Sequence, residues 1–459
     1  MNFGFCRYLR RCGLLVLLLA GITTTARADD GDRAALEAQK SRLFQQMLDN
    51  PANLDVTFAY ANVSAKLGDN EAAISALERM LLFNPNLPRV DLELGALYFR
   101  LGSFDIARTY FEKAAASKPL PAEVKARIDE YMALIAQQLS PTRLTGTLFF
   151  GAQHQTDANV APASGTIASP IGPVLLSNQF VKMSDWDIFA AGSLLFTYDL
   201  GNQDHDTIEV TGNGLVNHYM QVGRLDLDFG EVTVGPRFRF PELPDTFVKA
   251  VTVKPYGIFN EVGLGENQYF YTFGGGLEAT GIVWDDISLK GVFEYRDKTF
   301  TNAPDRPAST GLSGNDKVVV VSATKPVTDN SALSLEFDYV DQSTKFTYYS
   351  NQSYAVAGSY HIRYDGPKAF PYPLETTLYG SRLWSIYDAP DPCCNTSPTL
   401  FFSPSSRNDR HWRFGITQGA QVTDNIELIV QFQRDIVSSN LSLYGYTSNS
   451  VLFGPQIKF

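Results

Sequence analysis

The sequence predicts two separate domains of different class, an N-terminal α-helical repeat stack followed by a transmembrane antiparallel β-barrel of about fourteen strands. Three observations lead to this prediction. The hydrophobic period is helical over residues 32–139 and changes to two after Pro141, from where apolar and polar side chains alternate. Short and long connections between the expected strands also alternate. Finally, the chain ends on an amphipathic strand whose last residue is Phe459.

The composition argues against a nucleic-acid-binding protein and is compatible with a membrane barrel. The chain of 459 residues carries a formal net charge of -11, which opposes binding to nucleic acid. It contains 31 Phe and 22 Tyr at only 19% charged residues. No run of about 18 apolar residues could span a bilayer as a helix. A chain of this kind can still cross a membrane as a closed barrel.

The N-terminus has the features of an export signal. Arg7, Arg10 and Arg11 precede an apolar run at residues 13–22, and Ala26-Arg27-Ala28 provides small residues around a cleavage site. These features predict a secretory signal peptide over residues 1–28, so the mature protein should begin near Asp29.

Four cysteines are present, and two of them belong to the expected signal peptide. Cys12 precedes the apolar run, so it is not placed to be the acylated cysteine of a lipoprotein signal. The adjacent pair Cys393 and Cys394 could form a strained disulfide, bind a metal ion or have no role, and we favour the last.

Residues 29–141 are predicted to form a helical domain in the periplasm, containing two tetratricopeptide repeats (TPRs). The second repeat, residues 88–121, matches the consensus at Leu94, Gly95, Tyr98, Gly102, Ala107, Phe111, Ala114 and Pro119. A shift of 34 residues gives the first repeat, with Tyr60, Ala61, Ser64, Gly68, Ala73, Leu77, Met80 and Pro85. Small residues such as Gly95 and Ala107 allow the two helices of a repeat to approach closely. Because two repeats bury little surface, helices at 34–48 and 122–139 are expected to cap the stack.

The first helix of each repeat is expected to line a groove. By analogy with other such domains, the side chains facing it are Asn62, Lys66, Arg89, Phe99 and Arg100. Their chemistry suits an extended peptide that carries an acidic or carboxylate group. The alternative is that these residues are part of the solvated surface.

Residues 142–459 are predicted to form the barrel, because apolar and polar faces alternate repeatedly, as at residues 287–293, 333–339 and 426–432. The expected strands are 143–153, 186–198, 206–221, 224–240, 247–262, 268–283, 287–299, 317–324, 332–341, 349–363, 374–387, 411–422, 426–438 and 448–459. This even number returns both ends of the barrel to the periplasm.

The connections follow the pattern of short periplasmic turns and long external loops. Asp- or Asn-containing turns are expected at residues 284–286, 328–330 and 423–425, and long polar connections at 155–185, 301–316 and 388–410. The last strand places Val451, Phe453, Ile457 and Phe459 on one side. It resembles the closing strand of bacterial outer-membrane barrels, which implies that Phe459 is the signal read by the barrel-assembly machinery. The alternative is the last strand of a soluble β-sandwich.

No motif for catalysis, metal binding or cofactor binding is evident. The five histidines, at positions 154, 205, 218, 361 and 411, have no ligand spacing, and Gly274-Gly275-Gly276 lies inside an expected strand with no helix after it. We therefore expect no catalytic, metal-binding or cofactor-binding residue, and a protein that is not an enzyme. The alternative is a Ser, His and Asp site assembled only by the fold.

This architecture resembles the surface lipoprotein assembly modifiers, the Slam translocons. Residues 149–160, Phe-Phe-Gly-Ala-Gln-His-Gln-Thr-Asp-Ala-Asn-Val, are similar to that family's first barrel strand and the Asp-Ser-Asn-Val-like motif after it, with Ala158 where Ser is usual. The resemblance implies an outer-membrane translocon that moves a lipoprotein or soluble client protein from periplasm to cell surface, with the helical domain engaging the client or its chaperone. Its partners would be outer-membrane lipid, the client and the barrel-assembly machinery.

Two other functions remain open. Exopolysaccharide export porins also join periplasmic tetratricopeptide repeats to a barrel, although usually with longer repeat arrays, and a strongly charged lumen would be expected of them. A passive outer-membrane channel whose repeats only recruit partners is the second alternative. The two repeats seen here favour a translocon modestly.

Overall fold

The computed structural model describes residues 30–117, 121–162, 165–167, 173–177, 180–241, 247–284, 286–390 and 406–459. The chain forms two compact units, a helical unit that ends at Ser140 and a β-barrel made by Pro141–Phe459. The expected signal peptide and the pair Cys393 and Cys394 lie outside the described residues.

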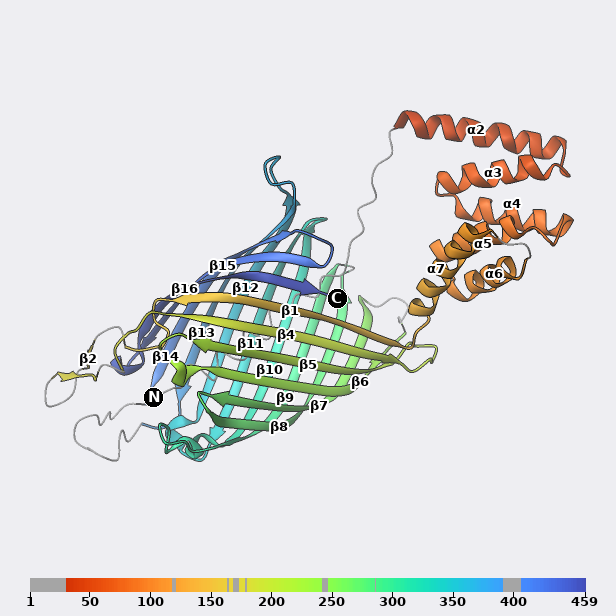
Figure 1. The fold of residues 1–459 in the computed structure, drawn as a ribbon. Helices are drawn as coiled ribbons and strands as arrows, with labels where there is room; N and C mark the ends of the chain where they lie inside the picture. Colours follow the sequence, from red (N-terminus) through yellow and green to blue (C-terminus); the bar gives the residue numbers. More distant parts are fainter. Residues whose placement is uncertain are drawn as a thin grey trace. The chain divides into compact units, whose positions relative to one another are not determined.

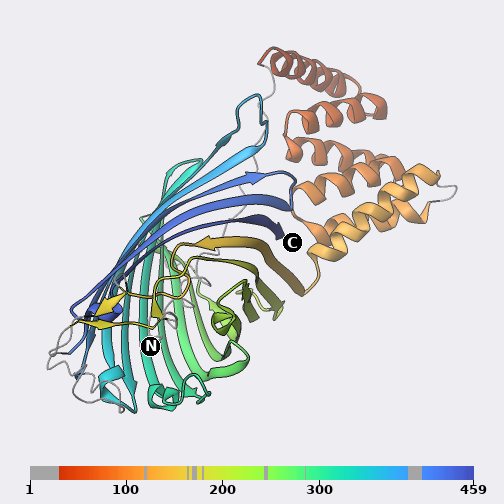
Figure 2. The same ribbon diagram turned by 60° about the vertical axis from the view of Figure 1, so that its left-hand side comes forward.

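Six helices make up the described part of the helical unit (Figures 1 and 2). They are α2 (Asp30–Asp49), α3 (Leu54–Lys66), α4 (Asn70–Phe83), α5 (Pro88–Arg100), α6 (Phe104–Ala116) and α7 (Ala122–Gln138). Local chemistry sets their starts: the Asn53 side chain accepts a hydrogen bond from the Val56 N–H, and Asp69 does the same for Ala72. Pro88 occupies the first turn of α5, where no N–H is needed. None of the described helices is both long and apolar enough to cross a lipid bilayer.

The helices pack in sequence order around two hydrophobic clusters. One cluster joins α2 to α5 through buried residues that include Leu77, Met80 and Leu94. The other joins α5, α6 and α7 around Phe111 and Ile128. The small residues of the repeat pattern are buried between helices, as predicted: Ala61, Ala73 and Ala107 are 2% exposed or less. The helical repeat architecture and both capping helices are therefore confirmed.

Fourteen antiparallel strands close into a barrel (Figure 1), which confirms the predicted strand number and order. They are β1 (Thr142–Gln155), β4 (Asp185–Asp199), β5 (Thr207–Tyr219), β6 (Leu227–Arg239), β7 (Val248–Leu264), β8 (Asn267–Val283), β9 (Ile287–Phe300), β10 (Gly314–Thr328), β11 (Ser331–Thr344), β12 (Asn351–Asp365), β13 (Pro373–Tyr387), β14 (Asn408–Gln421), β15 (Ile426–Ser439) and β16 (Tyr446–Lys458). Each strand pairs with its neighbours in sequence, and β1 pairs with β16 to complete the ring. A short hairpin of β2 (Thr166–Ile167) and β3 (Val174–Leu175) lies in the first long connection and was not predicted.

Apolar side chains lie on the outer face of the barrel wall, and charged side chains lie on its inner face. Leu333, Leu335 and Phe337 of β11 are 42–56% exposed, as expected for the convex face of a barrel. Charged side chains of the other face, such as Glu209 and Lys254, are less than 10% exposed because they pack against one another inside the lumen. An apolar outer face on a closed barrel is typical of outer-membrane proteins.

The connections are divided between the two ends of the barrel. We call the end that contains Thr142 and Phe459 the terminal end and the opposite one the long-loop end. The antiparallel order places all three long connections at the long-loop end. That end also carries a tight turn at residues 265–266, because β7 and β8 are the longest strands, with 17 residues each. All three long connections therefore lie at the long-loop end, as predicted, but short connections occur at both ends.

Candidate functional site

The five residues predicted to line a groove lie on the first helices of the two repeats. Lys66 and Arg100 are the last residues of α3 and α5, equivalent positions in successive repeats, and both are exposed. Asn62 lies one turn before Lys66 and is half-buried. Arg89 lies at the opposite end of α5 from Arg100.

Two of these five side chains also have packing roles. The guanidinium carbon of Arg89 lies 4.6 Å from the ring centroid of Phe58. The Phe99 ring packs edge-on against Phe104 of α6 and Tyr131 of α7, with centroids 5.4 Å and 5.3 Å away. The cations Lys66 and Arg100 are thus the pair best placed to meet a partner.

A carboxylate that the sequence did not single out joins three helices of the repeats. Glu78 of α4 accepts hydrogen bonds from the Tyr98 hydroxyl of α5 at 2.7 Å and from the Tyr110 hydroxyl of α6 at 3.3 Å. Burial, together with the hydrogen bond to Glu78, raises the pKa of Tyr98 to about 12. Tyr98 is a consensus position of the repeat, but its partner lies 20 residues away in the previous repeat. These bonds fix one repeat against the next.

The barrel lumen contains a ladder of ion pairs that begins on β5. Arg237 of β6 donates to Glu209 of β5 and to Glu278 of β8, each at 2.7 Å. Lys254 of β7 contacts Glu209 at 2.9 Å, and Lys290 of β9 contacts Glu278 at 2.7 Å. Each carboxylate therefore has two basic partners, which compensates the cost of burying its charge.

The ladder continues from β6 to β10. Arg296 of β9 contacts Glu231 of β6 and Glu294 of β9, both at 2.9 Å. Lys298 contacts Asp316 at 2.5 Å. The Tyr256 hydroxyl donates to Glu294 at 2.9 Å. We call the ten ionic residues the charge ladder: Glu209, Glu231, Arg237, Lys254, Glu278, Lys290, Glu294, Arg296, Lys298 and Asp316. Acids and bases are equal in number, so the charge ladder carries no net charge.

A different surface lines the lumen on β12 and β13. Alternation of the strands directs many small side chains inward there, namely Ser353, Ala355, Ala357 and Ser359 of β12, and Ser381 and Ser385 of β13. Leu383 and Tyr379 of β13 also face inward, opposite Ala355 and Ser359. The serine and alanine side chains carry no charge and project little. One side of the lumen is thus braced by ion pairs, and part of the other is lined by small residues.

Residues 156–159, which belong to the motif noted at the first strand, are held by hydrogen bonds at the long-loop end of the barrel. We call them the pinned motif. The Thr156 N–H donates to the Asn449 carbonyl of the last strand at 2.9 Å, and the Asn449 N–H donates to the Thr156 hydroxyl at the same distance. The Ala158 N–H donates to the Met183 carbonyl at 2.8 Å. Residues 156–159 therefore connect the closing seam of the barrel to the segment that enters β4.

Asp157 lies at the centre of this motif and is 1% exposed. Its Oδ1 accepts from the Ala161 N–H at 3.0 Å, whereas its Oδ2 has no hydrogen-bond partner among the described residues. Burial raises the pKa of Asp157 to about 6, although the hydrogen bond from Ala161 opposes this shift. The carboxyl is therefore placed to change its charge between pH 5 and pH 7.

Across the described residues, no group of three or more His, Cys, Asp or Glu side chains is arranged to bind a metal ion. The candidate functional surfaces are therefore the cations of the helical unit, the lumen walls and the pinned motif.

Comparison with known proteins finds similarity to solved structures over about a quarter of the chain. No family model matches the chain, and no curated protein matches it. Among solved structures, the chain is similar to PcrH in complex with the chaperone binding region of PopD, with 17% identity over 24% of this chain and 84% of that chain and a TM-score of 0.22. It is similar to the Yersinia enterocolitica chaperone SycD in complex with a YopD peptide, with 14% identity, 24% and 85% coverage and a TM-score of 0.22. A thermophilic TPR protein from Thermus thermophilus gives 23% identity, 24% and 55% coverage and a TM-score of 0.22.

Proposed function

We propose that this protein is an outer-membrane translocon that moves a lipoprotein or soluble client protein from the periplasm to the cell surface. The observation that carries the proposal is the combination, in one chain, of a closed barrel with a polar lumen and a helical repeat unit with accessible cations. The resemblance of residues 149–160 to the Slam family supports the same function.

The two units would divide the task. The helical unit, in the periplasm, would hold an extended acidic segment of the client or its chaperone, with Lys66 and Arg100 as the attracting charges. The barrel would provide the passage, because the charge ladder keeps one wall rigid while small side chains on β12 and β13 leave room for a chain to slide. Barrel strands satisfy their own backbone hydrogen bonds, so the barrel should fold without the helical unit.

The test removes residues 32–139 and compares cells with the full chain and with the truncated barrel. Surface-exposed proteins are labelled on intact cells and quantified by mass spectrometry, alongside total protein levels. We expect at least one protein to disappear from the surface while its total amount is unchanged. Heat-modifiable migration on gels verifies that the truncated barrel is folded.

A finer variant reverses the two groove charges. Lys66→Glu with Arg100→Glu should reduce display of the same client partially, since charge repulsion costs a few kcal/mol at most after salt screening. The matched control is Arg42→Glu with Arg108→Glu, the same charge change on α2 and α6. An unchanged surface proteome with the truncated barrel would favour a passive channel, and loss of surface polysaccharide alone would favour polysaccharide export.

A further inference from the structure

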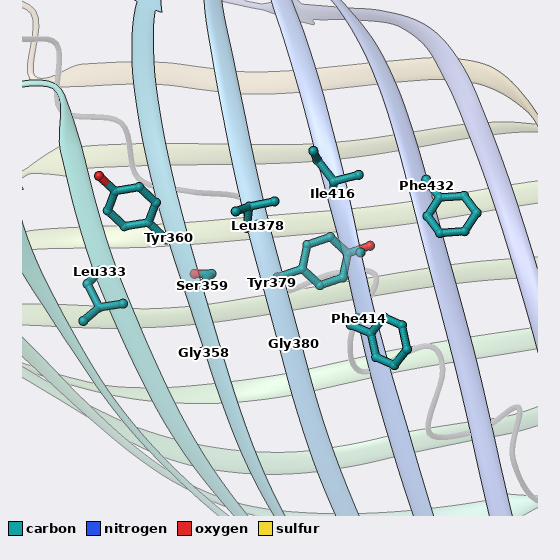
Figure 3. Close-up of a pocket in the computed structure, with 11 residues that line it drawn as sticks. Leu333, Gly358, Ser359, Tyr360, Leu378, Tyr379, Gly380, Phe414, Ile416 and Phe432 are labelled. Carbon is teal, nitrogen blue, oxygen red and sulfur yellow. The ribbon is translucent and has the colours of Figure 1, made fainter.

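The outer face of the barrel has an apolar groove across β11 to β15 (Figure 3). It arises because Gly358 of β12 and Gly380 of β13 are directly paired and neither has a side chain to cover the sheet. Its apolar wall residues are Leu333, Leu378, Phe414, Ile416 and Phe432. All five are 40–50% exposed.

Three arginines lie on the same outer face, beside the groove on the side of the long-loop end. Arg434 is in register with Phe414 and Gly380, whereas Arg382 and Arg410 lie further toward the long-loop end. Arg382 follows Gly380 by two residues on β13, Arg434 follows Phe432 by two residues on β15, and Arg410 lies on β14 between them. The register pairs Arg382 with Trp412 and Trp384 with Arg410. From strand spacing, the Cα atom of Arg382 lies roughly 8 Å from that of Arg410 and roughly 12 Å from that of Arg434. The Cα atoms of Arg410 and Arg434 are roughly 14 Å apart, a span that a single large headgroup can cover.

Two tryptophans hold Arg382 in position. The guanidinium carbon of Arg382 lies 4.5 Å from the Trp412 ring centroid and 4.8 Å from that of Trp384. Its Nε is buried and has no hydrogen-bond partner among the described residues. The ring faces stabilise the cation and orient it, yet they satisfy none of its N–H donors.

These arginines also lack acidic partners, which distinguishes them from other charges on the outer wall. None of the three makes an ion pair within the described part of the chain, whereas Lys317 of β10 contacts Asp341 at 3.4 Å. The outward charges Asp228, Glu261 and Asp297 on β6, β7 and β9 are all acidic. Unpaired positive charge thus lies on one side of the barrel, next to the groove.

We propose that this face binds a phosphorylated membrane lipid, with its phosphate on Arg382, Arg410 and Arg434 and an acyl chain in the groove over Gly358 and Gly380. Arginine offers several N–H donors in a planar arrangement that matches phosphate oxygens, and aromatic side chains commonly lie at the membrane interface of barrels. An unpaired cation on the lipid-facing wall is costly, and a lipid phosphate would neutralise it.

The arrangement of the arginines next to the apolar groove favours a lipid over a free anion as the ligand. The cations lie at the long-loop end of the groove, and the apolar walls extend from them toward the middle of the strands, as headgroup and chain are ordered in a bilayer leaflet. Inorganic phosphate would use only the arginines and would leave the groove without a function.

The test uses the purified full chain in detergent and bisphosphorylated lipid A as the probe, with lipid A stripped of its phosphates as the reference. Native mass spectrometry measures the bound fraction, and quenching by bromine-labelled acyl chains reports proximity to Trp384 and Trp412. We expect the phosphorylated lipid to bind at least tenfold more tightly than the stripped one, with quenching in both cases at saturation.

Two variants separate the headgroup from the chain. Arg382→Gln with Arg410→Gln and Arg434→Gln should remove the preference for the phosphorylated lipid. Gly380→Leu should fill the groove and weaken binding of both lipids severalfold, and it is sterically permitted because a Cβ there would meet no atom nearer than 3.8 Å. The controls are Lys317→Gln and Gly291→Leu, an outward cation and an outward glycine elsewhere on the wall, where a Cβ meets nothing within 4 Å.

Several results would overturn the proposal. These are equal binding of the two lipids by the unaltered chain, full competition by inorganic phosphate at the lipid's own concentration, or the same loss in the control variants. Heat-modifiable migration of every variant establishes that the barrel is folded before binding is compared.

Discussion

The Cα of Gly95 in α5 faces the ring of Phe111 in α6 so closely that a Cβ at Gly95 would lie 2.9 Å from two ring atoms. Phe111 is fully buried, so its ring has no space into which it could withdraw. We expect Gly95→Val to destabilise the helical unit by about 1–3 kcal/mol through overpacking. Thermal unfolding of the full chain, followed by circular dichroism at 222 nm, measures the effect. Ala115→Val on the exposed side of α6 adds a β-branched side chain without a clash and should cost only about 0.5 kcal/mol.

The last residue closes the barrel seam. The Gly146 N–H donates to the Phe459 carbonyl at 2.8 Å, and the Phe459 N–H donates to the Gly146 carbonyl at 3.1 Å. Deleting Phe459 or replacing it with Asp should reduce the amount of folded barrel in the outer membrane, because the final pair of bonds or the terminal apolar side chain is lost. Phe459→Leu keeps both and should assemble normally. Full assembly of the deletion variant, read by heat-modifiable migration, would contradict this role.

The orientation of the barrel gives a further prediction. An epitope inserted after Ala308, in the long connection between β9 and β10, should be reached by antibody on intact cells, and one at Asp329, in the turn between β10 and β11, should not. A tag at Asn395 should behave as the one at Ala308, although Asn395 lies outside the described residues. Labelling at Asp329 with protection at Ala308 would reverse the orientation.

The charge ladder predicts a change in conductance. Arg296→Ala leaves Glu231 and Glu294 without their shared cation, which should destabilise the barrel by about 3–5 kcal/mol. The same change leaves an excess of negative charge in the lumen, so the ratio of cation to anion permeability in planar bilayers should rise. Lys317→Ala, on the outer face, should alter neither quantity. An unchanged permeability ratio for Arg296→Ala would mean that ions do not pass this wall.

The pinned motif predicts a pH dependence. The pKa of Asp157 is raised from 3.8 to about 6 by burial, so the folded segment binds this proton more tightly than an unfolded one. The cost of the buried charge is therefore present in full above pH 6 and disappears as the pH falls toward 3.8. Lys182 attracts the charged form and reduces this cost without removing it.

Hydrogen exchange of residues 156–161 measures this dependence. After correction for the intrinsic rate, protection should be greater at pH 5 than at pH 7.5, and Asp157→Asn should make it nearly independent of pH. The helix α3, which belongs to the other unit, serves as the internal reference. Greater protection at pH 7.5 would show that Asp157 is stabilised in its charged form.

The residues predicted to line a groove of the helical unit show what a local sequence pattern can and cannot predict. The repeat consensus places Lys66 and Arg100 on equivalent helix ends, and the structure keeps them accessible there. The same consensus gives no indication that Phe99 packs between Phe104 and Tyr131, because those contacts depend on how α7 closes the stack.

The sequence by itself determined the helical repeats, the position of the change at Pro141 and all fourteen strands in order, because hydrophobic period and turn chemistry are properties of neighbouring residues. The tertiary structure alone decided which side chains meet across strands. Arg237 donates hydrogen bonds to Glu209, which lies 28 residues before it in the sequence, and to Glu278, which lies 41 residues after it. Gly358 pairs with Gly380 across two strands. Such pairs depend on the register and stagger with which the sheet closes, and no local pattern specifies them.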